Sequence, residues 1–569
     1  MIDYKKYIAS LLVPHVWLSE EQVIALIERP AESSHGDFAF PCFTLAKTLK
    51  KSPMGLAAEL QASINFDATI ISSAQVMWPY VNFFVNVQKL ALEVIPEVAA
   101  QKDQFGAGQA KWQKLMIESP GPNTNKPLHL GHVRNMLLGN ALEEIARFAG
   151  YDVTRVDIIN DRGVHICKSM LAYQLFGNNA EPDKKGDHFV WEWYVLFDTK
   201  NKEDPSMEDK AQEMLRAWED GDPEVRALWR KMNDWAINGM QETYARYGVA
   251  IDKAYAESDH YLKGKDVVQQ WLDQGIFVRD EKWNIVFIDE TENIKKVVLR
   301  ADGTSIYITQ DIVLAGLRYE DYKMDKMVYV VANEQIDHFK ALFAIFKKLG
   351  YSFANDCYHL AYGYISLPSG RMKSREGTVV DADDVADSMH ADALALIKQR
   401  YPELSDAESH VRAEQIAMAA IKFFMLKYDV FKDFIFDIEE SLSFDGETGP
   451  YLQYTHARCC SVLQKAGVGL DIESDAQFDL LHADEERLLL LHLYHFPTCV
   501  AQSAEKYTPD NVARYALTLA QLFNGYYQKQ QFIVDDPALQ KSRLALVSSV
   551  RQTMENALRL IGVEAPQQM

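Results

Sequence analysis

Hydrophobic residues in the middle of the chain follow two alternating patterns. Short apolar runs typical of buried parallel strands occur at 114–119 (KLMIES), 152–159 (DVTRVDII) and 327–333 (MVYVVAN). Between the first two, residues 131–149 place apolar side chains at three- and four-residue spacing, which predicts a helix that Gly150 ends. This strand–helix–strand order predicts a parallel sheet with its ligand at the carboxyl ends of the strands.

The segments on either side have different patterns. The N-terminal part mixes helical periodicity with strand-like runs such as 81–87 (VNFFVNV), and a polar, glycine-bearing linker follows at 101–109. Several helices rich in Trp, Glu and Lys at about 170–290 predict an insertion between two halves of the sheet. From about Asp384 onward the pattern is almost entirely helical, which predicts a bundle.

The fold class that follows from these patterns is α/β with additional domains. We expect an N-terminal α+β domain at 1–100 and a Rossmann-like parallel-sheet catalytic domain at 110–383, with the insertion inside it. An all-α bundle occupies 384–569. A chain of 569 residues is long enough for three or four domains of about 150 residues each.

Composition indicates an ordinary globular protein, but the net charge disfavours a nucleic-acid partner. Neither a signal-peptide core nor an apolar run near the roughly 20 residues of a membrane span is visible, so we expect a soluble, cytoplasmic protein. The chain has 59 Lys and Arg against 81 Asp and Glu, a net charge of −22, whereas nucleic-acid binders usually present basic surface. Because salt screens charges beyond about 8–10 Å, a local basic groove could still bind RNA.

The cysteines suit a reducing compartment and offer no zinc site. They form no CxxC pair, so we expect small buried residues and no structural zinc. They are Cys42, Cys167, Cys357, Cys459, Cys460 and Cys499.

The strongest chemical signal is the string PLHLGH at 127–132, between a predicted strand and a predicted helix. His129 and His132 lie at the helix start, where unpaired N–H groups and the helix dipole attract phosphate. Gly131 lets a flat base or ribose approach the backbone, and Lys126 adds a positive charge. HxGH alone is equally consistent with histidines that only cap or pack, and a metal site would need further ligands.

The residues around this string resemble the arginyl-tRNA synthetases, a family of class I aminoacyl-tRNA synthetases. These typically read E-x-x-x-P-N-x-x-K-P-x-H-x-G-H-x-R, and nine positions match across seventeen residues. The matching residues are Glu118, Pro122, Asn123, Lys126, Pro127, His129, Gly131, His132 and Arg134. The resemblance implies an enzyme that activates L-arginine with ATP and Mg²⁺ and then transfers it to the 3′ end of tRNA(Arg), with no membrane association. We expect a monomer.

The resemblance also implies an arginine site. Tyr307 and Asp311 lie four apart in RADGTSIYITQDIVLA, so one helical turn would put both on one side. A carboxylate can accept two N–H groups of a guanidinium while a hydroxyl or ring fixes its plane. The alternative is Asp311 as a helix N-cap. By resemblance Glu118 adds an acidic contact, and Asn123 and Gln335 face the backbone end of the amino acid.

A second class I signature is a basic loop after the sheet, and 363–384 (GYISLPSGRMKSREGTVVDADD) holds that place. By resemblance the catalytic residues are Lys126, His129, His132, Arg371, Lys373 and Arg375. Residues assigned to ATP binding are His129, Gly131, His132 and Met372. The loop string by itself is also consistent with a solvated basic turn.

Two further segments predict contacts with tRNA. Tyr451, Tyr454 and Arg458 share one helix face, where aromatic rings and arginine suit unstacked anticodon bases, although spacing alone favours a buried stripe. The resemblance assigns these three and the terminal Met569 to the anticodon loop. It assigns Tyr80 and Asn82 to the tRNA elbow, with a core strand as the alternative for Tyr80.

One departure and three rival functions stand beside this interpretation. Pro120 and Gly121 replace small hydroxyl residues of the family, which puts a hydroxyl contact to the substrate ammonium in doubt. The rivals are another class I synthetase, a smaller HxGH nucleotidyltransferase and a non-catalytic RNA-binding relative. The nucleotidyltransferase would not need the C-terminal bundle, and the intact histidines argue against the non-catalytic relative.

Overall fold

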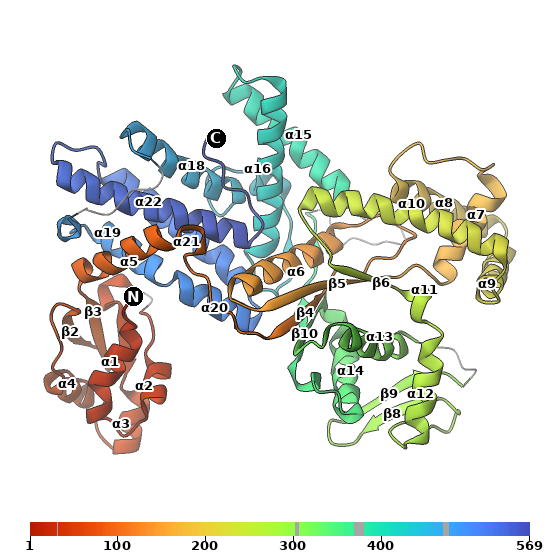
Figure 1. The fold of residues 1–569 in the computed structure, drawn as a ribbon, viewed down its shortest axis with the longest axis horizontal. Coiled ribbons are helices and arrows are strands. Elements are labelled where there is room, and N and C mark those ends of the chain that lie inside the picture. Colours follow the sequence, from red (N-terminus) through yellow and green to blue (C-terminus); the bar gives the residue numbers. More distant parts are fainter. Residues whose placement is uncertain (31, 302–305, 369–379, 470–476) are drawn as a thin grey trace.

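A central parallel sheet organises the computed structural model, which describes residues 1–30, 32–301, 306–368, 380–469 and 477–569 (Figure 1). The strand order is β11-β10-β4-β5-β6, and every neighbouring pair is parallel. The strands are β4 (Lys114–Glu118), β5 (Asp152–Ile159), β6 (Lys253–Ala256), β10 (Lys326–Ala332) and β11 (Cys357–Tyr362). From β4 the chain builds outward to β5 and β6 and later to β10 and β11 on the other side, so the order reverses between β4 and β10. Open parallel sheets bind ligands at such a reversal.

The helices of the sheet follow the predicted patterns. α6 (Leu130–Phe148) connects β4 to β5, and α14 (Ile336–Leu349) connects β10 to β11, with α13 (Tyr307–Tyr322) before β10. Gly150 closes α6 at a φ of 93°, and a side chain there would collide with the backbone of Gln109. The predicted Rossmann-like sheet is confirmed.

The predicted insertion at about 170–290 is two separate excursions from the sheet, because the chain returns to it at β6. The first excursion holds α7 (Val164–Phe176), α8 (Gly186–Glu203), α9 (Ser206–Glu219) and α10 (Pro223–Tyr247). The second holds α11 (Glu257–His260), α12 (Lys263–Asp273) and a small antiparallel sheet of β7 (Val278–Arg279), β8 (Ile285–Asp289) and β9 (Ile294–Leu299). Four residues, KAYA, are too short for a strand pattern, so β6 gave no signal in the sequence.

The N-terminal part is an α+β domain, as expected. Its antiparallel sheet has the order β1-β3-β2. The elements are α1 (Tyr4–Leu12), α2 (Glu20–Leu26), β1 (Phe38–Pro41), α3 (Phe43–Leu49), α4 (Pro53–Ser63), β2 (Ile71–Met77) and β3 (Tyr80–Val85). α5 (Val87–Gln101) then packs against the C-terminal bundle. The predicted linker is a packed segment, because Phe105 is fully buried and stacks on Phe496 at 5.9 Å.

The C-terminal part is the predicted helical bundle. It comprises α15 (Ala382–Arg400), α16 (Asp406–Leu426), α17 (Ile438–Ser441), α18 (Gly449–Lys465), α19 (Asp484–Tyr494), α20 (Phe496–Lys506), α21 (Pro509–Lys529) and α22 (Pro537–Leu560). A two-strand pair, β12 (Ile365–Ser366) with β13 (Phe434–Ile435), joins it to the catalytic region. Among the described residues, no helix has the length and apolar character that crossing a membrane requires.

Candidate active site

A cavity of about 780 Å³ lies at the carboxyl ends of β4, β5 and β10, where the strand order reverses. Its wall brings together eight of the predicted site residues, which come from segments more than two hundred positions apart. They are Glu118, Asn123, His129, Gly131, His132, Tyr307, Asp311 and Gln335. The cavity therefore joins the HxGH string to the predicted guanidinium-binding pair.

The two HxGH histidines cap α6 reciprocally. His129 Nδ1 accepts the N–H of Gly131, and His132 Nδ1 accepts the N–H of His129, both at 3.1 Å. Burial, helped by the charge of Lys126, lowers the pKa of His129 to about 3 and that of His132 well below its ordinary value. Both rings are therefore neutral at neutral pH. Because each Nδ1 accepts a hydrogen bond, each proton sits on Nε2, which is left to donate. Capping and facing a ligand are thus compatible.

Of the predicted catalytic residues that the structure describes, Lys126 alone is absent from the cavity wall. It lies half-buried on the same loop, and burial lowers the pKa of its ammonium. The predicted residues of the basic loop at 363–384 lie outside the described residues; they are Arg371, Met372, Lys373 and Arg375. On the far side of that loop, Asp381 forms a backbone bridge with His129.

The predicted guanidinium-binding pair lies on the first two turns of α13. Tyr307 begins the helix with its side chain largely exposed, and Asp311 follows one turn later. The N-cap of α13 is Ile306, so the alternative of Asp311 as an N-cap is wrong. Asp311 Oδ2 lies 2.6 Å from His338 Nε2, and the Asp311 side chain lines the cavity and remains 25% exposed.

Glu118 has a different environment. It is 9% exposed and forms an ion pair with Arg318, which is fully buried. Burial raises the pKa of Glu118, while Arg318 opposes that shift. The carboxylate of Glu118 is thus already matched by an internal guanidinium, whereas Asp311 is the acidic group more open to a bound one.

Sequence reasoning missed the partners of these carboxylates. Arg318 lies seven residues after Asp311, two turns further along the same face of α13. His338 lies three residues after Gln335 in NEQIDHF. The helical spacing on α13 offered a signal for Arg318, but the pairing of His338 with Asp311 depends on how α13 and α14 pack.

The departure at Pro120 and Gly121 lies on the cavity wall, beside a buried hydroxyl. The Ser119 hydroxyl donates to Asn135 and accepts from Arg155 Nη2 at 3.1 Å. It is committed to the protein interior, and it does not replace the hydroxyl that the family places at these positions.

Three of the four predicted anticodon residues, Tyr451, Tyr454 and Arg458, share one face of α18, and none of the three is fully buried. The Arg458 guanidinium lies 4.6 Å from the Tyr454 ring, and the Tyr451 hydroxyl accepts from Asn524 Nδ2 at 3.0 Å. The carbonyl of Met569 accepts from the Tyr401 hydroxyl at 2.8 Å, which ties the chain end to the bundle.

The two predicted elbow residues differ in exposure. Tyr80, at the start of β3, is partly exposed and contacts Phe43 edge-on at 5.3 Å between ring centres. Asn82, two residues along, is only 3% exposed. Its amide points toward the Met77 carbonyl inside the hairpin.

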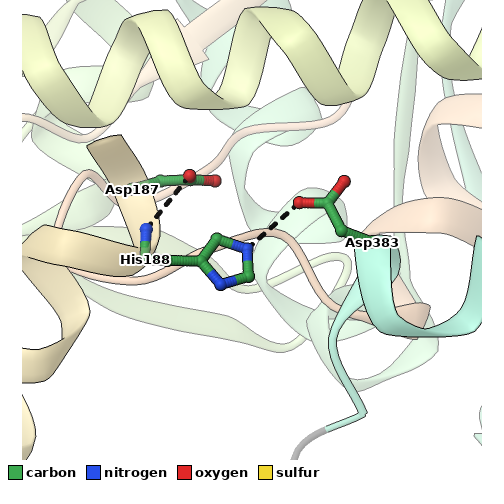
Figure 2. A group of neighbouring side chains, drawn as sticks. All are labelled: Asp187, His188 and Asp383. Carbon is green, nitrogen blue, oxygen red and sulfur yellow. Dashed lines mark hydrogen bonds and ion pairs between the residues drawn. The ribbon is translucent and has the colours of Figure 1, made fainter. Parts of the chain in front are cut away.

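One group of described side chains is close enough to hold a metal ion: Asp187, His188 and Asp383, whose nearest ligand atoms lie within 4.8 Å of one another (Figure 2). The group lies outside the cavity. Lys185 Nζ is 2.6 Å from Asp383 and 3.1 Å from Asp187, so an ammonium already occupies the place of a cation.

Known proteins resemble the chain over nearly its full length. The family described as "tRNA synthetases class I (R), catalytic domain" matches 94–438, "Arginyl tRNA synthetase N terminal domain" matches 4–85, and "DALR anticodon binding domain" matches 452–569. The arginine–tRNA ligase of Treponema denticola is 43% identical over 549 residues, covering 94% of this chain and 93% of that protein. The corresponding ligase of Porphyromonas gingivalis is 38% identical over 571 residues, covering 95% of each chain.

A solved structure agrees with these sequence matches. The arginyl-tRNA synthetase of Thermus thermophilus superposes with a TM-score of 0.84 at 26% identity, covering 100% of this chain and 99% of that one. One cavity holds both the HxGH helix start and the predicted guanidinium-binding pair, Tyr307 and Asp311. Together with this geometry, the matches show that the chain belongs to the class I arginyl-tRNA synthetase family.

Proposed function

We propose that this protein is an arginine–tRNA ligase that converts L-arginine and ATP to arginyl-adenylate and pyrophosphate, then transfers arginine to the 3′ end of tRNA(Arg) for protein synthesis. Family membership supports the reaction, with arginine, ATP and tRNA as substrates. The observation that carries the proposal is the single cavity in which the start of α6 faces Tyr307 and Asp311. Mg²⁺ enters with ATP as part of that substrate.

The HxGH end of the cavity suits the nucleotide. Phosphoryl transfer depends mainly on positioning and on stabilising negative charge. The Nε2–H groups of His129 and His132 and the N-terminus of α6 supply fixed donors for that charge. We assign the positive charge to Lys126 and to the loop residues Arg371, Lys373 and Arg375, with Met372 beside the nucleotide.

The opposite end suits arginine. Asp311 accepts the guanidinium N–H groups, with the Tyr307 ring and hydroxyl beside it and Glu118 as a further acidic group. Asn123 and Gln335 bind the backbone end, which presents the arginine carboxylate to the α-phosphate of ATP. The carboxylate oxygen forms a bond to phosphorus as the bond to pyrophosphate breaks.

The tRNA is assigned to the partly exposed faces of the other two domains. Tyr451, Tyr454, Arg458 and Met569 meet the anticodon loop, and Tyr80 meets the elbow. Asn82 acts at the elbow through the shape of its hairpin, since its side chain is buried. We propose a monomer that acts in the cytoplasm.

The decisive experiment is ATP–pyrophosphate exchange with each of the twenty amino acids, with and without tRNA(Arg). Exchange that depends on arginine supports the proposal. Exchange with another amino acid would assign the protein to a different specificity, and tRNA binding without any exchange would indicate a non-catalytic relative. Transfer is then measured as acid-precipitable arginine on tRNA(Arg).

A further inference from the structure

The backbone around His129 is held by a segment that lies more than 250 positions later in the chain. The N–H of Leu130 donates to the carbonyl of Val380 at 3.0 Å, and the N–H of Ala382 donates to the carbonyl of Leu128 at 2.9 Å. These two bonds flank His129 on both sides. The position of the HxGH string therefore depends on where residues 380–382 lie.

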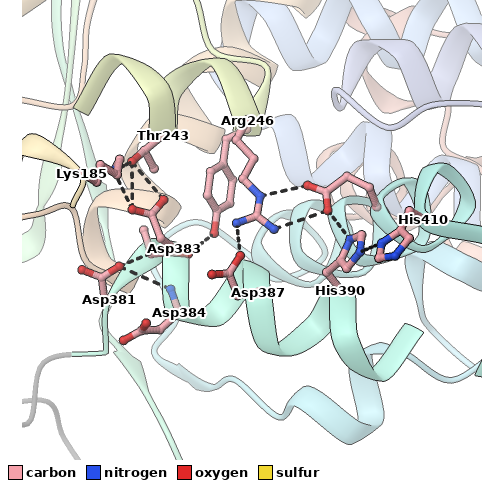
Figure 3. Close-up of polar contacts among 12 residues, drawn as sticks. Lys185, Thr243, Arg246, Asp381, Asp383, Asp384, Asp387, His390 and His410 are labelled. Atoms are coloured by element: carbon pink, nitrogen blue, oxygen red, sulfur yellow. Dashed lines mark hydrogen bonds and ion pairs between the residues drawn. The ribbon is translucent and has the colours of Figure 1, made fainter. Parts of the chain in front are cut away.

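Polar side chains of the first excursion, which holds α7 to α10, contact the other side of the 380–382 segment (Figure 3). Asp383 Oδ2 accepts from Lys185 Nζ at 2.6 Å and lies 3.1 Å from His188 Nε2, while Asp383 Oδ1 accepts from Thr243 Oγ1 at 3.1 Å. The Tyr247 hydroxyl donates to the carbonyl of Ala382 at 2.8 Å. α8 and α10 thus contact the residues that bridge to His129.

The charges make Lys185 the centre of this arrangement. Three carboxylates, Asp187, Asp381 and Asp383, gather around Lys185 and His188. Asp187 is fully buried, and a buried carboxylate that loses its cation is strongly disfavoured. Removing the Lys185 ammonium therefore pushes Asp383 away from Asp187, and with it the segment that bridges to His129.

We propose that Lys185 and His188 are positioning residues for adenylate formation: through Asp383 they hold residues 380–382 against Leu128 and Leu130, and so fix His129 beside ATP. The inference rests on the proposed function. Neither residue lines the cavity that holds the predicted arginine and ATP residues. Their effect passes through the backbone of the bridge.

The test compares Lys185→Met and His188→Leu, at the start of α8, with a control ion pair between α10 and the C-terminal bundle. Arg246 of α10 joins Asp387 of α15 at 2.5 Å and Glu414 of α16 at 3.0 Å, further from the bridge (Figure 3). Arg246→Met therefore loosens the α10–α15 contact and leaves Asp383 with its partners. Exchange kinetics are measured for ATP and arginine with saturating tRNA(Arg), together with thermal unfolding of the full chain.

We expect Lys185→Met and His188→Leu to lower kcat or raise the ATP KM at least tenfold, with the arginine KM within threefold of wild type. Lys185→Arg restores the cation and should recover most of the activity, and Arg246→Met should stay within threefold. Losses in Arg246→Met equal to those in Lys185→Met, in proportion to lost stability, would overturn the inference. So would one tightly bound metal per purified chain that Asp187→Ala removes. A wild type without arginine-dependent exchange would instead refute the proposed function.

Discussion

At the scale of single residues, the two carboxylates of the arginine end have different partners. Asp311 pairs with the His338 imidazole and is open to the cavity, whereas Glu118 is buried and forms an ion pair with Arg318. The seventeen-residue string and the four-residue spacing predicted that these side chains would meet. Arg318 and His338 were not predicted: the spacing on α13 placed Arg318 on the face of Asp311, but its pairing with Glu118 of β4 and that of His338 with Asp311 depend on tertiary packing.

Asp311→Ala should raise the arginine KM roughly 30- to 150-fold, because losing hydrogen bonds to a charged group costs about 2–3 kcal/mol. The ATP KM should stay within twofold, since the nucleotide end of the cavity is unchanged. Pyrophosphate exchange with each substrate varied in turn measures both constants. An unchanged arginine KM contradicts the assignment. Glu118→Gln is the contrasting variant, and it should lower stability because Arg318 loses its buried partner.

A second residue-scale prediction concerns Asp157, which supports the loop at Gly121. Asp157 is 1% exposed and accepts from the N–H of Gly121 at 2.8 Å and from the Tyr244 hydroxyl at 3.1 Å. Burial raises its pKa from 3.8 to about 6. Because the pKa is higher in the folded state, folding favours the protonated carboxyl. The wild type therefore loses stability as the pH rises from about 4 to about 6.

Asp157→Asn keeps an acceptor for Gly121 and carries no charge. Its stability relative to wild type should rise between about pH 4 and pH 6 by up to about 3 kcal/mol, at about 1.4 kcal/mol per pKa unit, and stay level above that interval. Urea midpoints of both proteins from pH 4.5 to pH 8 measure the difference. A difference that does not change with pH would show that the carboxyl ionises freely in the folded state.

At the scale of elements, periodicity predicted what was long and regular. β5 and α6 lie within a residue of their predicted bounds, since a buried strand and a three-and-four-spaced helix each carry a strong pattern. β6 was missed because four residues are too short for a strand pattern, and it is their pairing with β5 that makes them a strand. Residues 101–109 were predicted to be a linker, but Phe105 packs them against the bundle, and one aromatic residue among polar ones gives little signal.

α18 offers a prediction that separates RNA contact from packing. Tyr454→Ala should lower kcat/KM for tRNA(Arg) roughly 10- to 100-fold, because stacking on a base is worth about 1–3 kcal/mol. Exchange at saturating tRNA and the Tm should change little, because the ring is partly exposed. Tyr454→Phe keeps the ring and serves as the control. A strong fall in Tm without a selective loss of charging would mean that the ring is a packing residue.

At the scale of the whole molecule, the N-terminal domain rests on the C-terminal bundle, although the two lie at opposite ends of the sequence (Figure 1). The Tyr4 and Tyr494 rings meet edge-on at 5.2 Å, and Asp37 pairs with Arg487 of α19. Asp37 is 4% exposed and also accepts from the N–H of Val85 at 2.8 Å. Three domains were predictable from composition and pattern, but this contact joins residues 450 positions apart, and no local pattern encodes it.

The ion pair makes this docking testable. Arg487→Met removes the ion-pair partner of a buried carboxylate, which should cost about 3–5 kcal/mol and expose the connection between the N-terminal domain and α5 to limited proteolysis. Asp37→Asn removes the charge and keeps an acceptor for Val85. The double variant should therefore recover most of the loss, and a double-mutant cycle isolates the pair from the other contacts of Arg487. Equal losses in the single and double variants would mean that the loss comes from the other contacts of Arg487 and not from its pair with Asp37. In that case Asp37 would contribute to the hairpin of its own domain and not to the docking.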